Sequence, residues 1–261
     1  WFVAKDSNQM TVDTHLTMRV PNGTEPFSLT ASATSSESGA GATSSTTTVT
    51  LESVDVEAAA TITIDNVTGD NIVNAAEAAG TVAVTGSVGG DAKAGDTVTV
   101  HIGDHSFTTT VAEGKTWTVS VDGSVLAGNA SISASVTASD AGGNTTTVSA
   151  THAYGVDTSA NATITINDVA SDNVVNAAES GGTVVVTGTV GGDAKAGDVV
   201  TVQIGDHTLT ARVAEGNTWA VNVAGSVLAG NTSISASVSA SDDVGNSTRA
   251  SASHTYGVDL E

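Results

Sequence analysis

None of the 261 residues of the chain is cysteine. The chain has only 2 prolines, and its aromatic content is 3%. Basic residues are also scarce, because 7 Lys and Arg stand against 28 Asp and Glu, for a net charge of −21. Without disulfides, a small extracellular domain depends on packing or on a bound metal. The electrostatic field of such a negatively charged chain repels nucleic acid and anionic membranes and attracts cations. No apolar run approaches the roughly 18 residues of a membrane span, so we expect no nucleic-acid partner and no direct membrane insertion.

The chain also repeats itself. Residues 60–157 return as residues 162–259 at a constant offset of 102, without an insertion or a deletion. VGGDAKAGD is unchanged between the copies, and GNASISASVTASD returns as GNTSISASVSASD. A period near 100 residues is too long for a solenoid repeat and matches one whole domain. Tandem near-copies add length and multiplicity, whereas catalysis gains nothing obvious from them, so the repeat favours a segment of a surface protein.

Apolar and polar side chains alternate in short runs bounded by Gly, Asp or Asn, which predicts half-buried strands. In the first copy the seven predicted strands lie near residues 61–65, 82–88, 98–102, 107–111, 117–121, 132–138 and 148–154. Gly103-Asp104 predicts a tight hairpin, and Trp117 and Trp219 are expected in the two cores. Seven short antiparallel strands in about 100 residues predict an all-β fold of tandem immunoglobulin-like antiparallel β-sandwiches in a linear row.

We predict two complete repeats, at residues 57–158 and 159–259. Residues 1–56 are not a third copy, but their end, TSSTTTVTLESVD, is similar to GGNTTTVSATHAYGVD. We interpret them as the C-terminal part of a divergent domain of the same kind, whose first strands lie upstream or come from another chain. Because the chain begins at Trp1, we expect that an N-terminal start has been cut away. Leu260-Glu261 departs from the repeat and is interpreted as a cloning scar.

Acidic and amide side chains gather in the predicted loops. In a sandwich of this topology, alternate loops lie at opposite poles. Asp70, Glu77 and Asp157 of the first repeat should therefore face a second group at the near pole of the next repeat, namely Asp193, Asp198, Asp242 and Asn246. Five or more oxygen ligands from three segments suit calcium. Two alternatives stay open: these residues only make turns, or a self-contained site lies within residues 65–77.

The candidate calcium ligands, taken over both repeats, are Asp65, Asp70, Asn74, Glu77, Asp140, Asn144, Asp157, Asp172, Glu179, Asp193, Asp198, Asp242 and Asn246. The histidines do not form a transition-metal site. His152 and His254 are in phase with the core valines and are expected to be hydrogen-bonded structural residues.

The motifs ITI-x-x-V-x-x-DN-x-VNAAE, VTG-x-VGGDAKAGD and SVTASDAGGNTTT occur in this order in the first copy. Together they resemble the tandem immunoglobulin-like extender domains of giant RTX adhesins, of the biofilm and ice-binding type, which bacteria export by type I secretion. The resemblance implies an extracellular stalk at the bacterial cell surface, stiffened by calcium at the domain junctions, that holds an adhesive tip away from the cell. Its partners would be the neighbouring repeats of the same chain.

An enzyme is not expected. There is no cysteine nucleophile and no G-x-S-x-G elbow, and the paired carboxylates lack the aromatic platform on which a sugar would stack. Two other functions remain as alternatives to the stalk. One is a ligand-binding adhesion module, and the other is a subunit of a surface layer or filament.

Overall fold

In the computed structural model, the backbone is described for residues 27–35, 43–51 and 57–261, and side chains are described from residue 57 onward. The first described elements are β1 (Phe27–Ser35) and β2 (Thr43–Leu51), which pair antiparallel with Phe27 opposite Leu51. The remainder of the predicted partial domain at 1–56 lies outside the described residues.

The first repeat is a sandwich of two antiparallel sheets. One sheet has the order β3-β5-β8 and the other the order β10-β9-β6-β7. These strands are β3 (Ala60–Ile64), β5 (Thr81–Gly90), β6 (Thr97–Ile102), β7 (His105–Thr110), β8 (Thr116–Asp122), β9 (Ser131–Ser139) and β10 (Thr145–Ala153). The seven predicted strands are confirmed, and so is the hairpin at Gly103-Asp104, since Ile102 pairs with His105.

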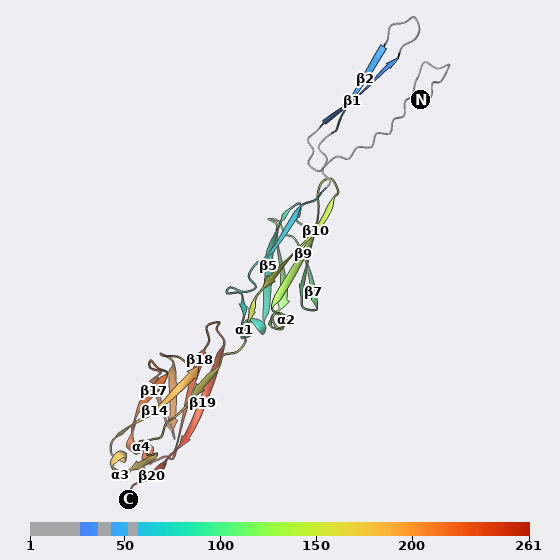
Figure 1. The fold of residues 1–261 in the computed structure, drawn as a ribbon. Coiled ribbons are helices and arrows are strands. Elements are labelled where there is room, and N and C mark those ends of the chain that lie inside the picture. The colour runs from blue at the N-terminus through green and yellow to red at the C-terminus, as the bar shows by residue number, and fades with distance from the viewer. Residues whose placement is uncertain (1–26, 36–42, 52–56) are drawn as a thin grey trace.

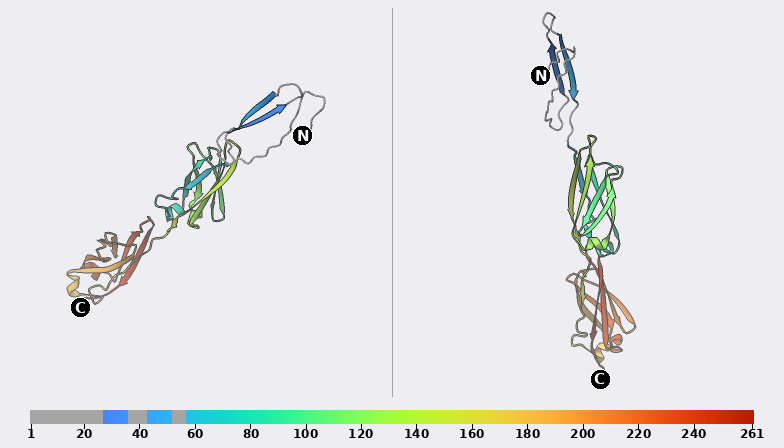
Figure 2. Two further views of the ribbon diagram at one scale, coloured as in Figure 1. Left: turned by 45° about the horizontal axis from the view of Figure 1, so that its top comes forward. Right: turned by 90° about the vertical axis from the view of Figure 1, so that its right-hand side faces the viewer.

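The second repeat has the same architecture. Its sheets have the orders β12-β14-β17 and β16-β15-β18-β19. The strands are β12 (Ala162–Ile164), β14 (Thr183–Gly192), β15 (Val199–Ile204), β16 (His207–Arg212), β17 (Thr218–Ala224), β18 (Ser233–Ser241) and β19 (Ser247–Thr255). The two sandwiches follow one another end to end, as Figure 1 and the two views of Figure 2 show. The predicted tandem sandwiches in a linear row are therefore confirmed.

Each sandwich has its own core, built from the inward side chains of both sheets. Trp117 and Trp219 are both 2% exposed, as expected from their place in the alternating pattern. Gly86 lies on β5 under Trp117, and a Cβ there would lie 2.0 Å from the Thr63 carbonyl oxygen and 2.5 Å from the indole ring. Only glycine lets the tryptophan approach the backbone this closely.

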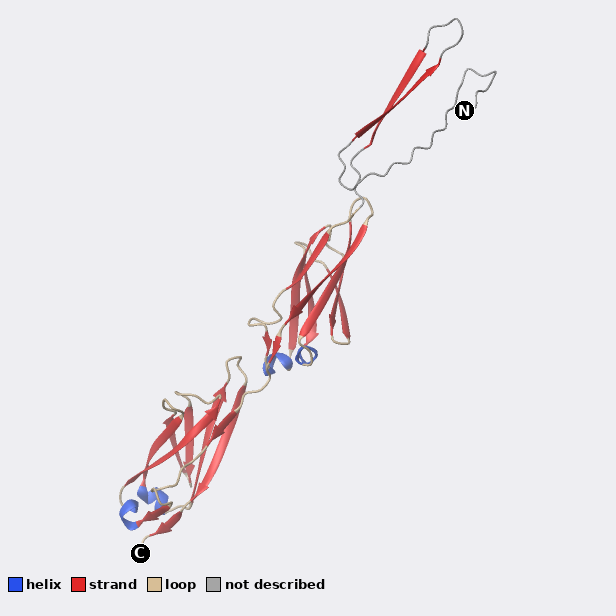
Figure 3. Cartoon of the chain, in the orientation of Figure 1, coloured by secondary structure: helices blue, strands red, loops and turns tan. Residues whose placement is uncertain are grey.

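Short elements close one end of each sandwich, which we call the helix pole. In the first repeat they are β4 (Ile72–Val73), α1 (Ala75–Ala78), α2 (Gly123–Ala127) and β11 (Gly155–Val156). Their counterparts are β13 (Val174–Asn176), α3 (Ala177–Ser180), α4 (Gly225–Ala229) and β20 (Gly257–Asp259). Figure 3 shows these helices at the same end of both sandwiches. None of the helices in the described residues is both long enough and apolar enough to cross a membrane.

The strands predicted near residues 61–65 and 82–88 imply a plain loop between them, and this is wrong, because β4 (Ile72–Val73) and α1 (Ala75–Ala78) lie there. Asn74 and Glu77 make a reciprocal capping box. The Asn74 side chain accepts from the Glu77 N–H, and the Glu77 carboxylate accepts from the Asn74 N–H. The two bonds satisfy donors that a helix start otherwise leaves unpaired. The Asn-x-x-Glu spacing was the sequence signal for this helix.

Candidate functional site at the junction between the repeats

The helix pole of the first repeat contacts the opposite pole of the second repeat, which we call the loop pole. Three hydrogen bonds join them. Asn74 Nδ2 donates to the Val244 carbonyl (3.1 Å), the Ala75 N–H donates to Asn246 Oδ1 (2.7 Å), and Asn246 Nδ2 donates to the Asp157 carbonyl (2.9 Å). The expectation that these two poles face one another is confirmed by these contacts.

The surface that the first repeat presents comes from two strands that run parallel. β4 pairs with β11, and the Asp157 N–H donates to the Val73 carbonyl (3.1 Å). This pairing places the segment before α1 beside the segment that leaves the repeat. Paired residues that are 83 positions apart in the sequence therefore present one continuous edge to the next repeat.

The surface of the second repeat is the turn between β18 and β19, in the pattern Asp242-x-x-x-Asn246. Asp242 accepts from the backbone N–H groups of Val244 and Asn246 and from Asn246 Nδ2. Burial alone would raise the pKa of Asp242. The bonds from the Asn246 side chain and from the backbone amides of the turn outweigh it and hold the pKa below 3.8. The carboxylate is thus ionised at neutral pH and fixes the direction of the Asn246 side chain.

Asn246 is 4% exposed, one of two buried polar side chains among the described residues. Its hydrogen bonds satisfy both ends of its amide, as burial requires. The carboxylates around it are more open to water. Glu77 Oε2 caps α1 at 3.0 Å from the Asn74 nitrogen, and Asp157 Oδ1 accepts from the Ser159 N–H at 3.2 Å. In each of these two carboxylates, one oxygen holds its own loop and the other accepts no hydrogen bond within the described residues.

Three more predicted ligands, Asp70, Asp193 and Asp198, make hydrogen bonds within their own repeats. Asp70 caps its own turn, and its pKa is lowered by bonds from the Ile72 N–H and the Thr68 hydroxyl. Asp193 accepts from the Asn161 N–H (2.7 Å), and Asp198 accepts from the Lys195 N–H (2.9 Å).

Asp65 lies beside β5, where Thr85 Oγ1 donates to its carboxylate (2.8 Å). Asn167 stands at the same position of the second repeat and bonds Thr187 Oγ1 (3.0 Å). This position therefore anchors a loop to the sheet whether or not it carries a charge.

Four further predicted ligands occupy the outer poles. Asp140 accepts from the N–H and side chain of Asn144 at the loop pole of the first repeat, and its pKa is lowered chiefly by the Asn144 side chain. Asp172 accepts from the Val174 N–H, and Glu179 caps α3, both at the helix pole of the second repeat. These residues therefore make, at the two outer ends of the two repeats, the same kinds of hydrogen bond as the residues at the junction.

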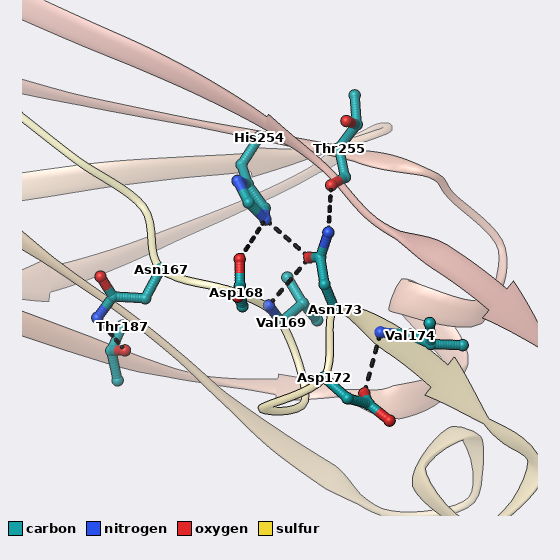
Figure 4. A network of polar contacts seen from close by, with 9 residues as sticks. All are labelled: Asn167, Asp168, Val169, Asp172, Asn173, Val174, Thr187, His254 and Thr255. Carbon is teal, nitrogen blue, oxygen red and sulfur yellow. Dashed lines mark hydrogen bonds and ion pairs between the residues drawn. The ribbon is translucent and has the colours of Figure 1, made fainter.

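A second amide holds each helix pole to the last strand, and the sequence analysis did not assign it this role. Asn173 adopts a left-handed conformation (φ 64°). As Figure 4 shows, its side chain accepts from the Val169 N–H and bonds His254 Nε2, and it donates to the Thr255 carbonyl. Asn71 and His152 make the same contacts in the first repeat. The histidines are structural, as expected, and an asparagine before a strand was the available signal, since asparagine tolerates positive φ.

Within the described residues, no group of three or more His, Cys, Asp or Glu side chains is arranged closely enough to hold a metal ion by itself. Any cation at the junction would therefore draw on amide and backbone oxygens as well as on carboxylates. The donors present are all oxygens, the ligand type that calcium prefers. The site thus suits a hard cation in its chemistry.

The fold and the junction define this chain as a row of immunoglobulin-like repeats with a polar, acid-rich joint. No known family profile matches it, and no curated protein matches it. Solved structures do. One is of a 1.5-MDa bacterial ice-binding adhesin and concerns its retention on the host cell surface. It is 43% identical over 90% of this chain and 75% of that chain, with a TM-score of 0.77.

Another is a Ca²⁺-stabilised adhesin with which an Antarctic bacterium reaches out and binds ice. It is 44% identical over 90% of this chain, with a TM-score of 0.69. The present chain spans 57% of that structure. The chain belongs to the family of tandem immunoglobulin-like repeat domains of large bacterial adhesins.

Proposed function

We propose that this chain is a stalk segment of a bacterial cell-surface adhesin, and that calcium stiffens the joint between its repeats. The observation that carries the proposal is the direct contact between the helix pole of one repeat and the loop pole of the next. The short linker at residues 158–161 and the hydrogen-bonded joint hold the two repeats together as one longer unit. The family relationship places such a body in adhesins.

The surface of the repeats supports a mechanical role over a ligand-binding one. Among the residues with described side chains, the large apolar side chains that are exposed are Val156, Val185, Val199 and Leu260, which are scattered. Isolated exposed apolar residues are ordinary on any surface and do not mark a binding patch. In this proposal the repeats provide reach and stiffness. We place their limits at residues 57–158 and 159–259.

Calcium is proposed because the junction collects negative charge without a matching number of cations. Glu77, Asp157 and Asp242 border the contact. The ion pair Lys195–Asp243 at 3.6 Å, which involves the neighbour of Asp242 in the sequence, is exposed and weak. Like charges at one joint repel each other unless a cation neutralises them. These three carboxylates are the proposed ligands, together with the amide and carbonyl oxygens of the joint. Calcium would supply charge neutralisation and a cross-link between the repeats.

Glu77→Gln tests this proposal, because glutamine keeps an acceptor for the Asn74 N–H and so retains the helix cap. The matched control is Glu179→Gln, which changes the same capping box at the far pole of the second repeat. Calcium would be titrated while the amide NMR signals of Val244 and Asn246 are followed. The charge of the ligand set tunes calcium affinity. Glu77→Gln should therefore lower the calcium affinity, read from the titration midpoint at these amides, by about tenfold, or about 1.4 kcal/mol.

Glu179→Gln should leave the midpoint at these two amides unchanged. Junction amides of the wild type that do not respond to millimolar calcium would overturn calcium as the cofactor. Equal midpoints for the two variants would remove Glu77 from the ligand set.

A further inference from the structure

The parallel strand pair at the helix pole has different lengths in the two repeats. In the second repeat, β13 and β20 form three residue pairs, ending with Asn176 opposite Asp259. In the first repeat, β4 and β11 form two pairs and stop at Val73 opposite Val156. The residues that would form the third pair, Asn74 and Asp157, are the same residue types as Asn176 and Asp259. The local sequence therefore does not explain why the first ladder is shorter.

The missing rung is occupied by the neighbouring repeat. After the bond from the Asp157 N–H to the Val73 carbonyl, the next bond of a parallel ladder would run from the Ala75 N–H to the Asp157 carbonyl. Instead, the Ala75 N–H donates to Asn246 Oδ1 and the Asp157 carbonyl accepts from Asn246 Nδ2. A carboxamide carries an acceptor and a donor side by side, as a peptide group does. Asn246 therefore stands between the two backbone groups that would otherwise pair directly.

The geometry of the inserted amide is set within its own turn. Asn246 Nδ2 lies 2.7 Å from Asp242 Oδ2, and the Asn246 N–H donates to Asp242 Oδ1 at 2.9 Å. The equivalent turn of the first repeat has the same two bonds, between Asn144 and Asp140, at 2.7 and 2.8 Å. The turn thus adopts one conformation in both repeats. The side chain is preorganised, which reduces the entropy lost when it docks.

We propose that Asn246 is the residue that fixes the orientation of the second repeat on the first, as an amide latch that replaces the third rung of the β4–β11 pair. When the repeats separate, Asn74 and Asp157 pair with each other, as Asn176 and Asp259 do. When the repeats dock, the pair opens and Asn246 takes both backbone groups. The latch consists of protein groups alone, so it defines the docked orientation without a metal. This goes beyond the proposed calcium joint, which adds stability to an orientation that the latch has already set.

The absence of cysteine allows a direct test on the full chain. Cysteines introduced by Thr108→Cys on β7 and Thr210→Cys on β16, both at exposed positions, would carry spin labels for distance measurement. The variant is Asn246→Ala, and the matched control is Asn144→Ala, which removes the same turn amide from the far pole of the first repeat. All samples are measured in EDTA, so that calcium does not contribute.

We expect one narrow distance as the major population in the parent chain and in Asn144→Ala. Asn246→Ala should lose that population and give a broad distribution. The control also shows whether loss of the turn amide disturbs folding, because both substitutions remove the same hydrogen bond to the aspartate of the turn. An Asn246→Ala distribution as narrow as the parent's, or a broad distribution in the parent, would overturn the latch.

A second measurement detects the hydrogen bond between the Ala75 N–H and the Asp157 carbonyl directly. Scalar coupling across the hydrogen bond between the Ala75 nitrogen and the Asp157 carbonyl carbon should be absent in the parent chain and appear in Asn246→Ala. The same coupling between Ala177 and Asp259 serves as the internal reference in every sample. If the Ala75–Asp157 coupling does not appear while the reference is detected, the rung exchange is wrong. Because these measurements contain no calcium, their failure is distinct from a failure of the calcium titration.

Discussion

Replacing Asn74 by alanine should weaken both repeats, whereas the equivalent change in the second repeat should weaken only one. Asn74 caps α1 and also donates to Val244 across the junction. Asn176 caps α3 through the N–H groups of Ala178 and Glu179 and makes no hydrogen bond to another repeat within the described residues. The comparison of Asn74→Ala with Asn176→Ala therefore separates the helix cap from the contact between repeats.

The magnitudes follow from the bonds that are lost. Loss of an asparagine N-cap costs about 1 kcal/mol, and this applies to both variants. Asn74→Ala loses a further hydrogen bond and leaves the Val244 carbonyl without that donor, which costs about 1 kcal/mol more. We thus expect a loss of about 2 kcal/mol in the first repeat for Asn74→Ala, against about 1 kcal/mol in the second repeat for Asn176→Ala.

Hydrogen exchange read by mass spectrometry suits this test, because peptides from β5 and β14 report the opening free energy of each repeat separately. Asn74→Ala should also lower protection in β14, since the second repeat loses a contact to its neighbour. Asn176→Ala should leave β5 unchanged. If Asn74→Ala affects the first repeat alone, and by no more than the cap, then the Asn74–Val244 bond does not couple the repeats.

Calcium should stabilise the folded chain by about 2.7 kcal/mol at a hundredfold excess over its Kd, so equal melting temperatures in EDTA and in millimolar calcium would contradict the proposed cofactor. Asp157→Asn should weaken calcium binding in calorimetry, whereas Asp104→Asn, in the β6–β7 turn, should not. Small-angle scattering should give a narrower ensemble in calcium than in EDTA, because calcium reduces the minority of undocked chains, and superimposable profiles would exclude the ion as a stiffener. The lowered pKa of Asp242 means that its bonds stabilise the turn fully above the ordinary value near 3.8. Their contribution is lost as the pH falls through the folded value, so the docked distance measured in EDTA should persist at pH 5 and be lost only in acid below the ordinary value.

Much of the fold was predictable because it rests on local pattern. The alternation of valine and threonine fixed which side of each strand faces the core. The repeat of 102 residues then required that whatever fold the first copy adopts is adopted by the second. The sequence also carried the signal for the helix cap that the loop prediction missed, since Glu77 follows Asn74 by three positions, with two residues between them, as a capping box needs.

The candidate site was predictable only to the level of which poles meet. The sequence contains Asn144 and Asn246 in the same turn pattern and assigns both the same role, and the turn bonds are indeed alike. What separates them is the surface to which each is presented. That surface for Asn246 is formed by Ala75 and Asp157, which are 171 and 89 residues away along the chain.

The sequence by itself thus determined the repeat, the sandwich and the polar character of the joints, because these follow from residue type and short-range spacing. The tertiary structure alone decided that one amide enters the ladder of the neighbouring repeat. That contact requires β4 and β11 to run parallel and end side by side, and a parallel pair joins segments distant in sequence that no local pattern brings together. This pairing gives Asn246, one of the thirteen candidate ligands, its two bonds across the junction.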